Sequence, residues 1–318
     1  MMRVMIVGAG AMGSLFGARF AAAGAPVFLL DVDAVHVSAI RTHGLRLKEL
    51  SGEEKTFRLE ASCEPMAWDP PADLILVMVK SYATQEALRL VSPQSVGPRT
   101  LFLSLQNGMG NAEILSRLVG GDRVLVGVTA QGATKLAPGL VRHGGVGPTF
   151  FGSLSGSPPN GIAELLHLFS ASGLEAAYRP DIRDLLWHKL CVNVGINAVT
   201  ALCGIDNGSV AALDPARRLC EAAVSEAVAV ARAEGIALPE DMTERVLAVA
   251  EATASNRSSM RQDVEGRRPT EIEAINGAVV RSARRLGLAA PVNWTLTQLV
   301  KIRELTYGDG EHGAKPTG

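Results

Sequence analysis

The chain has 318 residues, 47% of them hydrophobic and 20% charged, with a formal net charge of −1. This length exceeds what one hydrophobic core usually serves, so two domains are expected. The charge balance offers no electrostatic basis for binding nucleic acid or an anionic membrane. The apolar runs fall short of the roughly 20 residues that span a bilayer, and the first residues lack a secretion-signal pattern. The four cysteines lack metal-ligand spacing and fit reduced thiols, so we expect a cytoplasmic protein without a metal site.

The first half of the chain alternates predicted strands and helices. Short apolar runs bounded by turn residues predict strands at residues 3–8, 26–31, 73–80, 100–108 and 123–130. With helical stretches between them, these predict an α/β domain over residues 1–180, a doubly wound Rossmann domain with a mostly parallel sheet. The glycine-rich segment 139–152 is interpreted as a hairpin at the sheet edge.

The second half, residues 181–306, predicts an all-α domain. Helical patterns cover residues 185–202, 215–235, 240–254 and 270–287. Thr270 and Glu273 have the spacing of a capping box, which would begin the last long helix. The polar, glycine-rich residues 307–318 are expected to form a disordered tail.

The stretch VGAGAMG places Gly8, Gly10 and Gly13 in the G-x-G-x-x-G spacing, after a predicted strand and at the start of a helix. The first glycine permits the tight turn, the second lets a pyrophosphate approach the backbone, and the third lets the helix pack on the strand. The helix start, with Ala11 and Met12, presents unpaired N–H groups to the phosphates. This context favours dinucleotide binding over a turn that is merely tight.

The second predicted strand ends at Asp31, eighteen residues after Gly13. A carboxylate there typically hydrogen-bonds the adenosine ribose 2′-OH, so Asp31 favours NAD. It would repel a 2′-phosphate, because two unit charges ~4 Å apart at an effective dielectric of ~20 cost ~4 kcal/mol. The alternative is that Asp31 or Asp33 caps the next helix.

Within WHKLCVNVGINAVTAL, residues 187–202, Lys189, Asn193 and Asn197 recur every fourth residue and share one helix face. The rest of this helix is apolar, so the helix is expected to be buried. A lysine and two amides buried without partners would be costly, which points to a polar ligand such as a carbonyl, hydroxyl or carboxylate. The alternative is a structural salt bridge of Lys189, with the amides bonded to loops.

The chain resembles the ketopantoate reductase (2-dehydropantoate 2-reductase) family over nearly its whole length. The matching motifs are GAGAMG, VKSY with Lys80, LQNGMGN with Asn107, WHKLCVNVGINAVTAL, and SSMRQDVEGRRPTEIEAING with Ser259 and Glu271. The last two stretches are specific to that family, whereas the glycine turn is not. The resemblance implies a Rossmann domain followed by a helical domain.

The resemblance also implies roles for the residues of the helical domain. Lys189 matches the catalytic lysine, which stabilises charge on the keto oxygen and delivers the proton. Glu271 matches an active-site carboxylate that binds the substrate hydroxyl or orients the lysine; alternatively, it favours a helix dipole. Asn193, Asn197 and Ser259 match substrate-holding positions.

Two positions lie at predicted strand ends. Lys80 matches a cofactor-side lysine, and Asn107 matches a position near both the nicotinamide and the substrate. Asn107-Gly108 is also an ordinary turn dipeptide. Ser258 competes with Ser259 for the serine position, because the two are adjacent.

The expected activity is therefore reduction of ketopantoate, or a related small 2-keto acid, with NAD(P)H. NADPH is the norm in the resembling family, whereas Asp31 favours NADH; service in pantothenate synthesis and the choice between monomer and homodimer stay open. One alternative is a β-hydroxyacid dehydrogenase, which shares the glycine turn and the lysine–asparagine spacing but not the serine and TEIEAING stretches. Another is a dinucleotide-binding regulatory protein without turnover.

Overall fold

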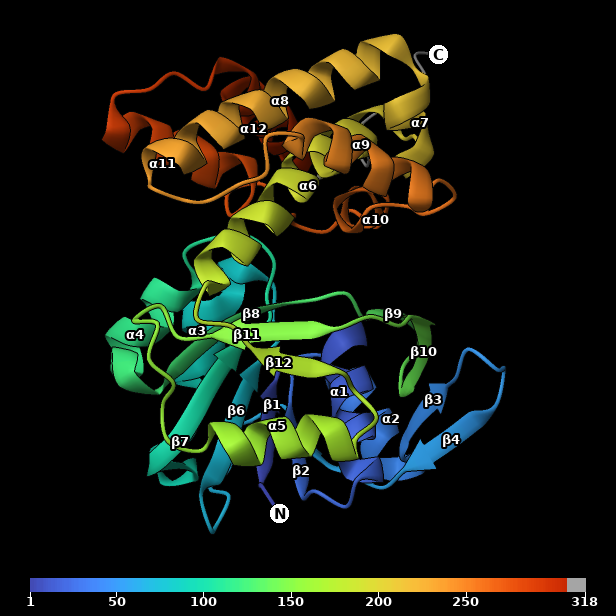
Figure 1. The fold of residues 1–318 in the computed structure, drawn as a ribbon. Helices are drawn as coiled ribbons and strands as arrows, with labels where there is room; N and C mark the ends of the chain where they lie inside the picture. Colours follow the sequence, from blue (N-terminus) through green and yellow to red (C-terminus); the bar gives the residue numbers. More distant parts are fainter. Residues whose placement is uncertain (308–318) are drawn as a thin grey trace, which may run out of the picture. The chain divides into compact units, whose positions relative to one another are not determined.

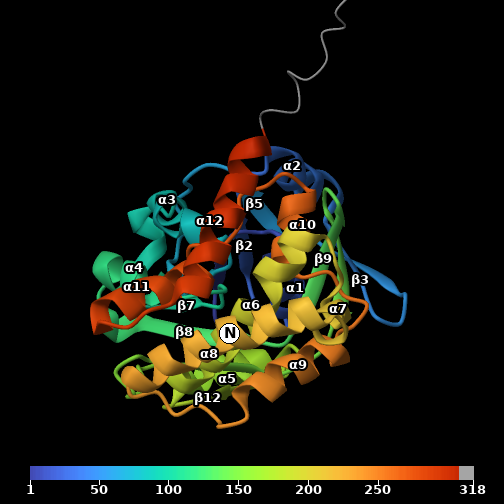
Figure 2. The same cartoon turned by 90° about the horizontal axis from the view of Figure 1, so that it is seen from above.

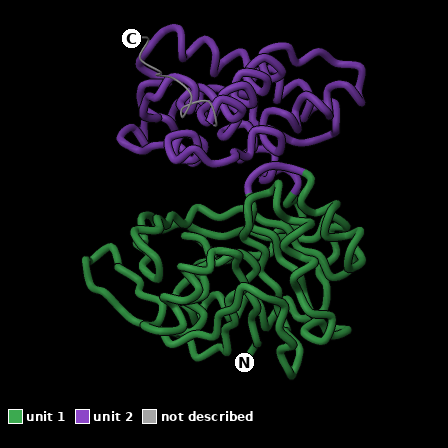
Figure 3. The backbone as a smooth tube through the Cα atoms, turned by 180° about the vertical axis from the view of Figure 1, so that it is seen from behind, with its two compact units in different colours: residues 1–106, 110–182 green, residues 107–109, 183–318 purple. Residues whose placement is uncertain are grey.

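The computed structural model describes residues 1–307 and divides into two compact units (Figure 3). Unit 1 comprises residues 1–106 and 110–182, and unit 2 comprises residues 107–109 and the chain from residue 183 onward. The division differs from the predicted boundary by two residues and places 107–109 with the helical part. The predicted tail, 307–318, lies outside the described residues except for Tyr307.

Unit 1 is built on an eight-stranded sheet (Figure 1). Its strands are β1 (Val4–Val7), β2 (Val27–Leu30), β5 (Glu60–Ser62), β6 (Ala72–Val77), β7 (Val96–Ser104), β8 (Val124–Thr129), β11 (Thr149–Gly152) and β12 (Ala176–Tyr178). The order is β12-β11-β8-β7-β6-β1-β2-β5, and every neighbouring pair is parallel except β8 with β11. The run β5-β2-β1-β6-β7-β8 is the strand order of the doubly wound dinucleotide-binding fold, in which the order reverses beside β1. The predicted α/β class is confirmed.

Helices pack on this sheet through its apolar side chains. They are α1 (Ala11–Ala22), α2 (Ala34–His43), α3 (Thr84–Arg89), α4 (Asn111–Val119) and α5 (Ile162–Ala171), with short 3₁₀ turns η1 (Ser81–Ala83), η2 (Pro93–Ser95) and η3 (Gly121–Arg123). The rings of Phe16 and Phe20 on α1 lie 6.0 and 5.3 Å from the ring of Phe169 on α5. These aromatic contacts place α1 and α5 on the same face of the sheet.

A second sheet of four strands was not anticipated from the sequence. It consists of β3 (Leu45–Lys48), β4 (Glu54–Phe57), β9 (Gly132–Ala137) and β10 (Leu140–Gly145), in the order β4-β3-β10-β9. The interpretation of residues 139–152 as one hairpin at the main sheet edge is wrong. The hairpin is β9–β10 and belongs to the second sheet, because β10 pairs with the distant β3, while β11 continues into the main sheet.

Unit 2 is helical, as predicted. Its helices are α6 (Ile182–Cys203, whose first residue is assigned to unit 1), α7 (Asn207–Ala212), α8 (Asp214–Ala233), α9 (Met242–Ala252), α10 (Ser259–Glu265), α11 (Asn276–Leu286) and α12 (Pro291–Leu305). Seen from above, α6 has α8 and α9 on one side and α10 and α12 on the other (Figure 2). Gly195 permits the close approach of α8 and α9, since a Cβ there would lie 2.8 Å from Cys220 Sγ and from Val246 Cγ1.

By length and composition alone, helix α6 is long and apolar enough to cross a membrane. From the sequence, every apolar run is instead expected to be too short for this. The most apolar window of α6 is 61% buried within the protein, however, as is usual for a core helix. Length and composition therefore reflect its central place in the hydrophobic core of unit 2.

The predicted capping box is also wrong. The hydroxyl of Thr270 accepts a hydrogen bond from the N–H of Ile272 at 3.2 Å, and Glu273 binds the side chains of Arg281 and Lys301. Residues 271–275 form turns, so α11 begins only at Asn276.

Candidate active site

The glycine turn connects β1 to α1 in unit 1. Gly8 has φ of +99°, and a Cβ there would lie 2.6 Å from the backbone N of Val79, in the loop after β6. A Cβ on Gly13 would lie 1.9 Å from the carbonyl oxygen of Gly8. At Gly10, by contrast, a Cβ would meet no atom of the described residues within 4 Å. Gly8 and Gly13 are thus required by the fold, whereas Gly10 leaves open space.

The start of α1 fits an anion. Gly10 provides no side-chain cap, and the first turn of α1 carries no acidic residue. The N–H groups of this turn therefore have no side-chain cap and no carboxylate in the first turn to neutralise the positive helix end. The turn fits the pyrophosphate of a dinucleotide.

Asp31 follows β2 at the carboxyl edge of the sheet, and its N–H donates to Ser62 O at 3.1 Å. Its Oδ1 accepts from the N–H of Asp33 at 2.9 Å, while its Oδ2 makes no hydrogen bond to the rest of residues 1–307. The helix cap is Asp33, whose Oδ1 accepts from the N–H of His36 at 3.0 Å. The capping role is thus filled by Asp33, which leaves Asp31 one carboxylate oxygen for a ligand.

Gln106 fixes the strand ends of unit 1 and was missed from the sequence. Its Nε2 donates to the carbonyl oxygen of Val79 at 2.8 Å and to the hydroxyl of Thr84 at 2.7 Å, and its Oε1 accepts from Ser104 at 2.9 Å. This network ties the end of β7 to the loop after β6, in which Lys80 directly precedes η1. Lys80 therefore lies in the same loop as Val79, whose backbone N packs against Gly8 of the glycine turn.

The polar stripe lies on α6, and its amides lack partners. The Nδ2 atoms of Asn193 and Asn197 are buried and make no hydrogen bond within the described part of the chain. Nearly all buried polar atoms in proteins are paired, and an unpaired one costs about 1–3 kcal/mol. Two such donors on one helix face indicate that a ligand with acceptor atoms completes them.

Lys189 lies on the same face of α6 as these amides, and its ammonium group interacts electrostatically with the carboxylate of Glu271. Burial lowers the pKa of Lys189 to about 8, and the negative charge of Glu271 opposes this shift. Glu271 is only 6% exposed and accepts a hydrogen bond from Asn107 Nδ2 at 3.4 Å. The three predicted residues Lys189, Glu271 and Asn107 are thus brought together in unit 2.

The segment 107–109 is held against the turn that follows Glu271. The N–H of Met109 donates to Ala274 O at 2.8 Å, and Gly108 has φ of +79° with no room for a Cβ beside Ala274. The Asn-Gly pair is therefore a turn, and the same turn also delivers the Asn107 amide to Glu271.

The structure distinguishes the two adjacent serines. Ser258 is buried and caps α10 by accepting from the N–H of Arg261 at 3.1 Å, and its hydroxyl lies 2.7 Å from that of Thr200 on α6. Ser259, the first residue of α10, is exposed. The structural role belongs to Ser258, and the hydroxyl of Ser259 is accessible to a ligand.

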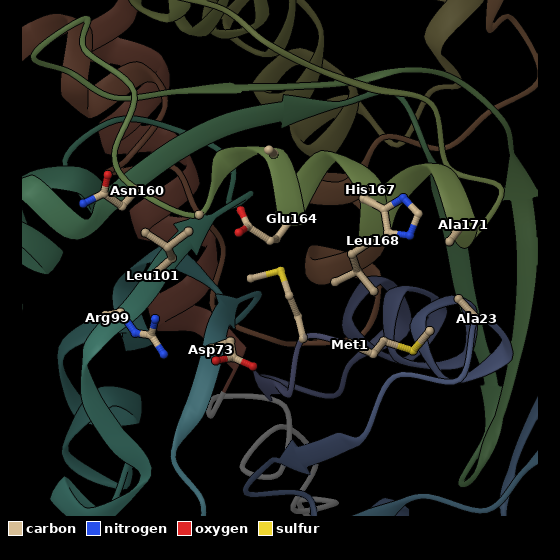
Figure 4. Close-up of a pocket in the computed structure, with 13 residues that line it drawn as sticks. Met1, Ala23, Asp73, Arg99, Leu101, Asn160, Glu164, His167, Leu168 and Ala171 are labelled. Atoms are coloured by element: carbon tan, nitrogen blue, oxygen red, sulfur yellow. The ribbon is translucent and has the colours of Figure 1, made fainter.

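None of these residues lines the pocket of about 730 Å³ in unit 1 (Figure 4). Met1, Asp73 and Leu101 line it together with Glu164 and His167 of α5. It borders the amino end of β6, whereas ligands of open α/β sheets bind at the carboxyl ends of the strands. Because of this position, the pocket is not part of the candidate site despite its volume.

Comparison with known proteins decides the family. Residues 4–156 match the model of Ketopantoate reductase PanE/ApbA, and residues 181–304 match that of the Ketopantoate reductase PanE/ApbA C terminal. The chain belongs to the ketopantoate reductase family. The family predicted from the motifs is confirmed, and this ketopantoate reductase family member is an NAD(P)-dependent oxidoreductase.

Relatives of this reductase cover nearly its full length. The 2-dehydropantoate 2-reductase of Halobacterium salinarum is 42% identical over 303 residues, which are 95% of this chain and 99% of that protein. A PanE/ApbA family ketopantoate reductase from Ralstonia eutropha is 34% identical with a TM-score of 0.89, covering 96% and 99% of the two chains. The ternary structure of D-mandelate dehydrogenase with NADH and anilino(oxo)acetate is 29% identical, also with a TM-score of 0.89 and coverage of 96% and 99%. These similarities support a nicotinamide cofactor.

Proposed function

We propose that this chain reduces ketopantoate, or a closely related small 2-keto acid, to the 2-hydroxy acid in the cytoplasm. The observation that carries the proposal is the polar cluster of unit 2. It combines the cation of Lys189, the buried carboxylate of Glu271, and the orphaned amide donors of Asn193 and Asn197. A 2-keto acid offers a carbonyl and a carboxylate, which are the acceptors that these donors lack.

Reduction adds a hydride to the keto carbon and a proton to the keto oxygen. A bound nicotinamide cofactor supplies the hydride. The Lys189 ammonium stabilises the negative charge that develops on the oxygen and then gives it the proton. A pKa of about 8 suits this role, because the group stays largely protonated at neutral pH yet releases its proton more readily than an ordinary lysine.

The remaining polar groups of unit 2 hold the substrate. Glu271 accepts a hydrogen bond from the substrate hydroxyl and stabilises the protonated lysine, and Asn107 orients this carboxylate. Asn193 and Asn197 donate to the acid and carbonyl oxygens, and Ser259 adds a hydroxyl contact. These substrate contacts would explain why a buried helix face carries two amides whose Nδ2 donors have no partner among residues 1–307, instead of apolar side chains.

Unit 1 holds the cofactor through the glycine turn. Gly8 and Gly13 shape the turn, Gly10 leaves room for a pyrophosphate, and the N–H groups of Ala11 and Met12 at the start of α1 would bind it. Lys80 of unit 1 would also hold the cofactor, and Asn107, which belongs to unit 2, is the further cofactor-binding candidate.

The adenosine end favours NADH, because the available Oδ2 of Asp31 accepts a hydrogen bond from the ribose 2′-OH and repels a 2′-phosphate. Asp31→Ala should therefore raise kcat/KM for NADPH relative to NADH, measured from initial rates with both cofactors. An unchanged ratio would remove Asp31 from the ribose site.

The test of the activity is a panel of initial rates with ketopantoate and with phenylglyoxylate, the keto acid that corresponds to mandelate. The second acid is included because the D-mandelate dehydrogenase structure with NADH is so similar. We expect the larger kcat/KM with ketopantoate. A larger value with phenylglyoxylate would assign the chain to aromatic 2-keto acids, and turnover of neither acid would contradict both assignments.

A further inference from the structure

Lys135 reaches the start of α2 from the second sheet. It lies on β9, and its Nζ is 2.8 Å from Asp33 Oδ2, although the two residues are 102 positions apart. The other oxygen of Asp33 caps α2. Both side chains of the ion pair are 38% exposed, so the pair borders solvent. The Asp33 carboxylate is thus engaged on both oxygens, and its pKa is lowered chiefly by the hydrogen bond from Lys135.

This ion pair adjoins the residue assigned to the ribose. The N–H of Asp33 donates to Asp31 Oδ1, so the two carboxylates are joined by one hydrogen bond. The charges of Asp31, Asp33 and Lys135 all act on His36, whose pKa is lowered mainly by burial and further by Lys135, while both carboxylates oppose the shift. The three charges therefore share one neighbourhood at the carboxyl end of β2.

His36 anchors the second sheet at this place. Its Nδ1 accepts from the N–H of Gly139, in the turn between β9 and β10, at 3.0 Å. The tautomer with a proton on Nε2 then donates to the hydroxyl of Ser14 at 3.2 Å, and Ser14 donates to Ala9 O in the glycine turn. The strand that carries Lys135 is thereby fixed to both α1 and α2.

We propose that Asp33 holds Lys135 in an ion pair and so withholds the cation that a 2′-phosphate would need, which makes both residues determinants of cofactor choice beside Asp31. This inference rests on the proposed assignment of Asp31 to the adenosine ribose. A lysine ammonium is a mobile point charge that binds phosphate well when it is available. While Lys135 is paired with Asp33, the two charges cancel and the carboxylate of Asp31 leaves a net negative charge. This net charge favours the uncharged 2′-OH of NADH over a 2′-phosphate.

The test is the variant Asp33→Asn in the full chain. Asparagine caps a helix about as well as aspartate, so α2 should persist while the ion pair is lost. The readout is the Kd of NADPH and of NADH, each measured by titration in the absence of a keto acid. Nicotinamide fluorescence monitors the binding. We expect the Kd for NADPH to fall about tenfold, the size of one partly exposed charge-assisted contact, with NADH unchanged within about twofold. Asp33→Asn combined with Lys135→Met should lose most of the gain for NADPH.

A matched control breaks another exposed ion pair of the second sheet. Arg46 and Glu54 on β3 and β4 lie 3.4 Å apart, and Glu54→Gln should leave the Kd of both cofactors unchanged. If Asp33→Asn brings no gain for NADPH, or if the gain survives in the double variant, the proposal is overturned.

A second variant covers the case in which Asp33→Asn does not fold. Lys135→Met alone leaves the Asp33 charge unbalanced and should weaken NADPH binding a few-fold; unchanged or tighter binding contradicts the proposal. Cofactor binding is measured without turnover. A failure to reduce ketopantoate would therefore overturn the proposed activity without affecting the interpretation of this binding test.

Discussion

The glycine turn of unit 1 and the polar face of α6 in unit 2 are proposed to bind their ligands in opposite ways. The turn is made of backbone, and the space around each missing Cβ separates glycines that the fold requires from Gly10, which it does not. The face of α6 is made of side chains, and the Nδ2 atoms of Asn193 and Asn197 on it have no hydrogen-bond partner among residues 1–307. The site proposed for the first region is space left open, whereas the site proposed for the second is hydrogen-bonding capacity left unsatisfied.

The largest effect is expected from Lys189→Ala. Loss of a general acid should lower kcat roughly 10²–10⁴-fold, while the Kd for the cofactor, which is held mainly by unit 1, stays nearly the same. Initial rates and a cofactor titration on the same protein check both halves. The neighbouring His188→Gln is the control, because its side chain points about 100° away around the helix. Full turnover by Lys189→Ala would show that another group supplies the proton.

Two alanine substitutions in the glycine turn should separate folding from binding. Gly13→Ala forces a Cβ to within 1.9 Å of Gly8 O and should lower the free energy of unfolding by more than about 3 kcal/mol. A Cβ in Gly10→Ala meets no atom of residues 1–307 within 4 Å, so stability should fall far less than in Gly13→Ala, but cofactor binding should weaken by about 1–3 kcal/mol as the methyl group enters the proposed pyrophosphate space. Thermal melts and cofactor titrations distinguish them. Equal loss of stability in both variants would contradict the comparison.

Replacing an amide on the polar face of α6 with an apolar residue should raise the free energy of unfolding while impairing activity. Asn197→Leu removes a buried donor that has no partner among residues 1–307, and it should stabilise unit 2 by up to about 1 kcal/mol while raising KM for the keto acid. The matched variant Asn276→Leu breaks a bond from Asn276 Nδ2 to Asn293 Oδ1 of 3.0 Å and should destabilise by about 1–3 kcal/mol. Denaturant unfolding measures both. A destabilised Asn197→Leu protein would mean that its amide is satisfied without a ligand.

Five of the eight strands of the main sheet (β1, β2, β6, β7 and β8), the central helices and the glycine turn could be predicted because their signals are local. Strands such as β1 and β6 are apolar on both faces, and α6 carries its stripe at helical spacing. The second sheet could not be predicted, because β3 and β4 have only four residues each and β3 pairs with β10 from a distant part of the chain. The alternation of Leu45 and Leu47 with polar residues in β3 does not indicate which distant strand is its partner.

The residue types of the candidate site can be recognised in the sequence, whereas the contacts that support them cannot. Lys189 and the two amides lie in the motif of residues 187–202, Glu271 lies in a separate motif, and the structure brings Asn107 to Glu271. The network of Gln106 and the ion pair of Asp33 with Lys135 depend on strand ends that meet only after folding. The Thr270–Glu273 spacing misled, because Glu273 is drawn to Arg281 and Lys301 instead of to a helix start.

The most direct test of the account is the pH dependence of kcat/KM for ketopantoate, from about pH 6 to about pH 10. Because Lys189 must be protonated to act, activity should fall as the pH rises through about 8. Glu271 raises the pKa of Lys189, so Glu271→Gln should move this falling limb to lower pH. A limb that stays at the same pH in the variant, or activity that rises through pH 8, would contradict the assignment of Lys189 as the acid.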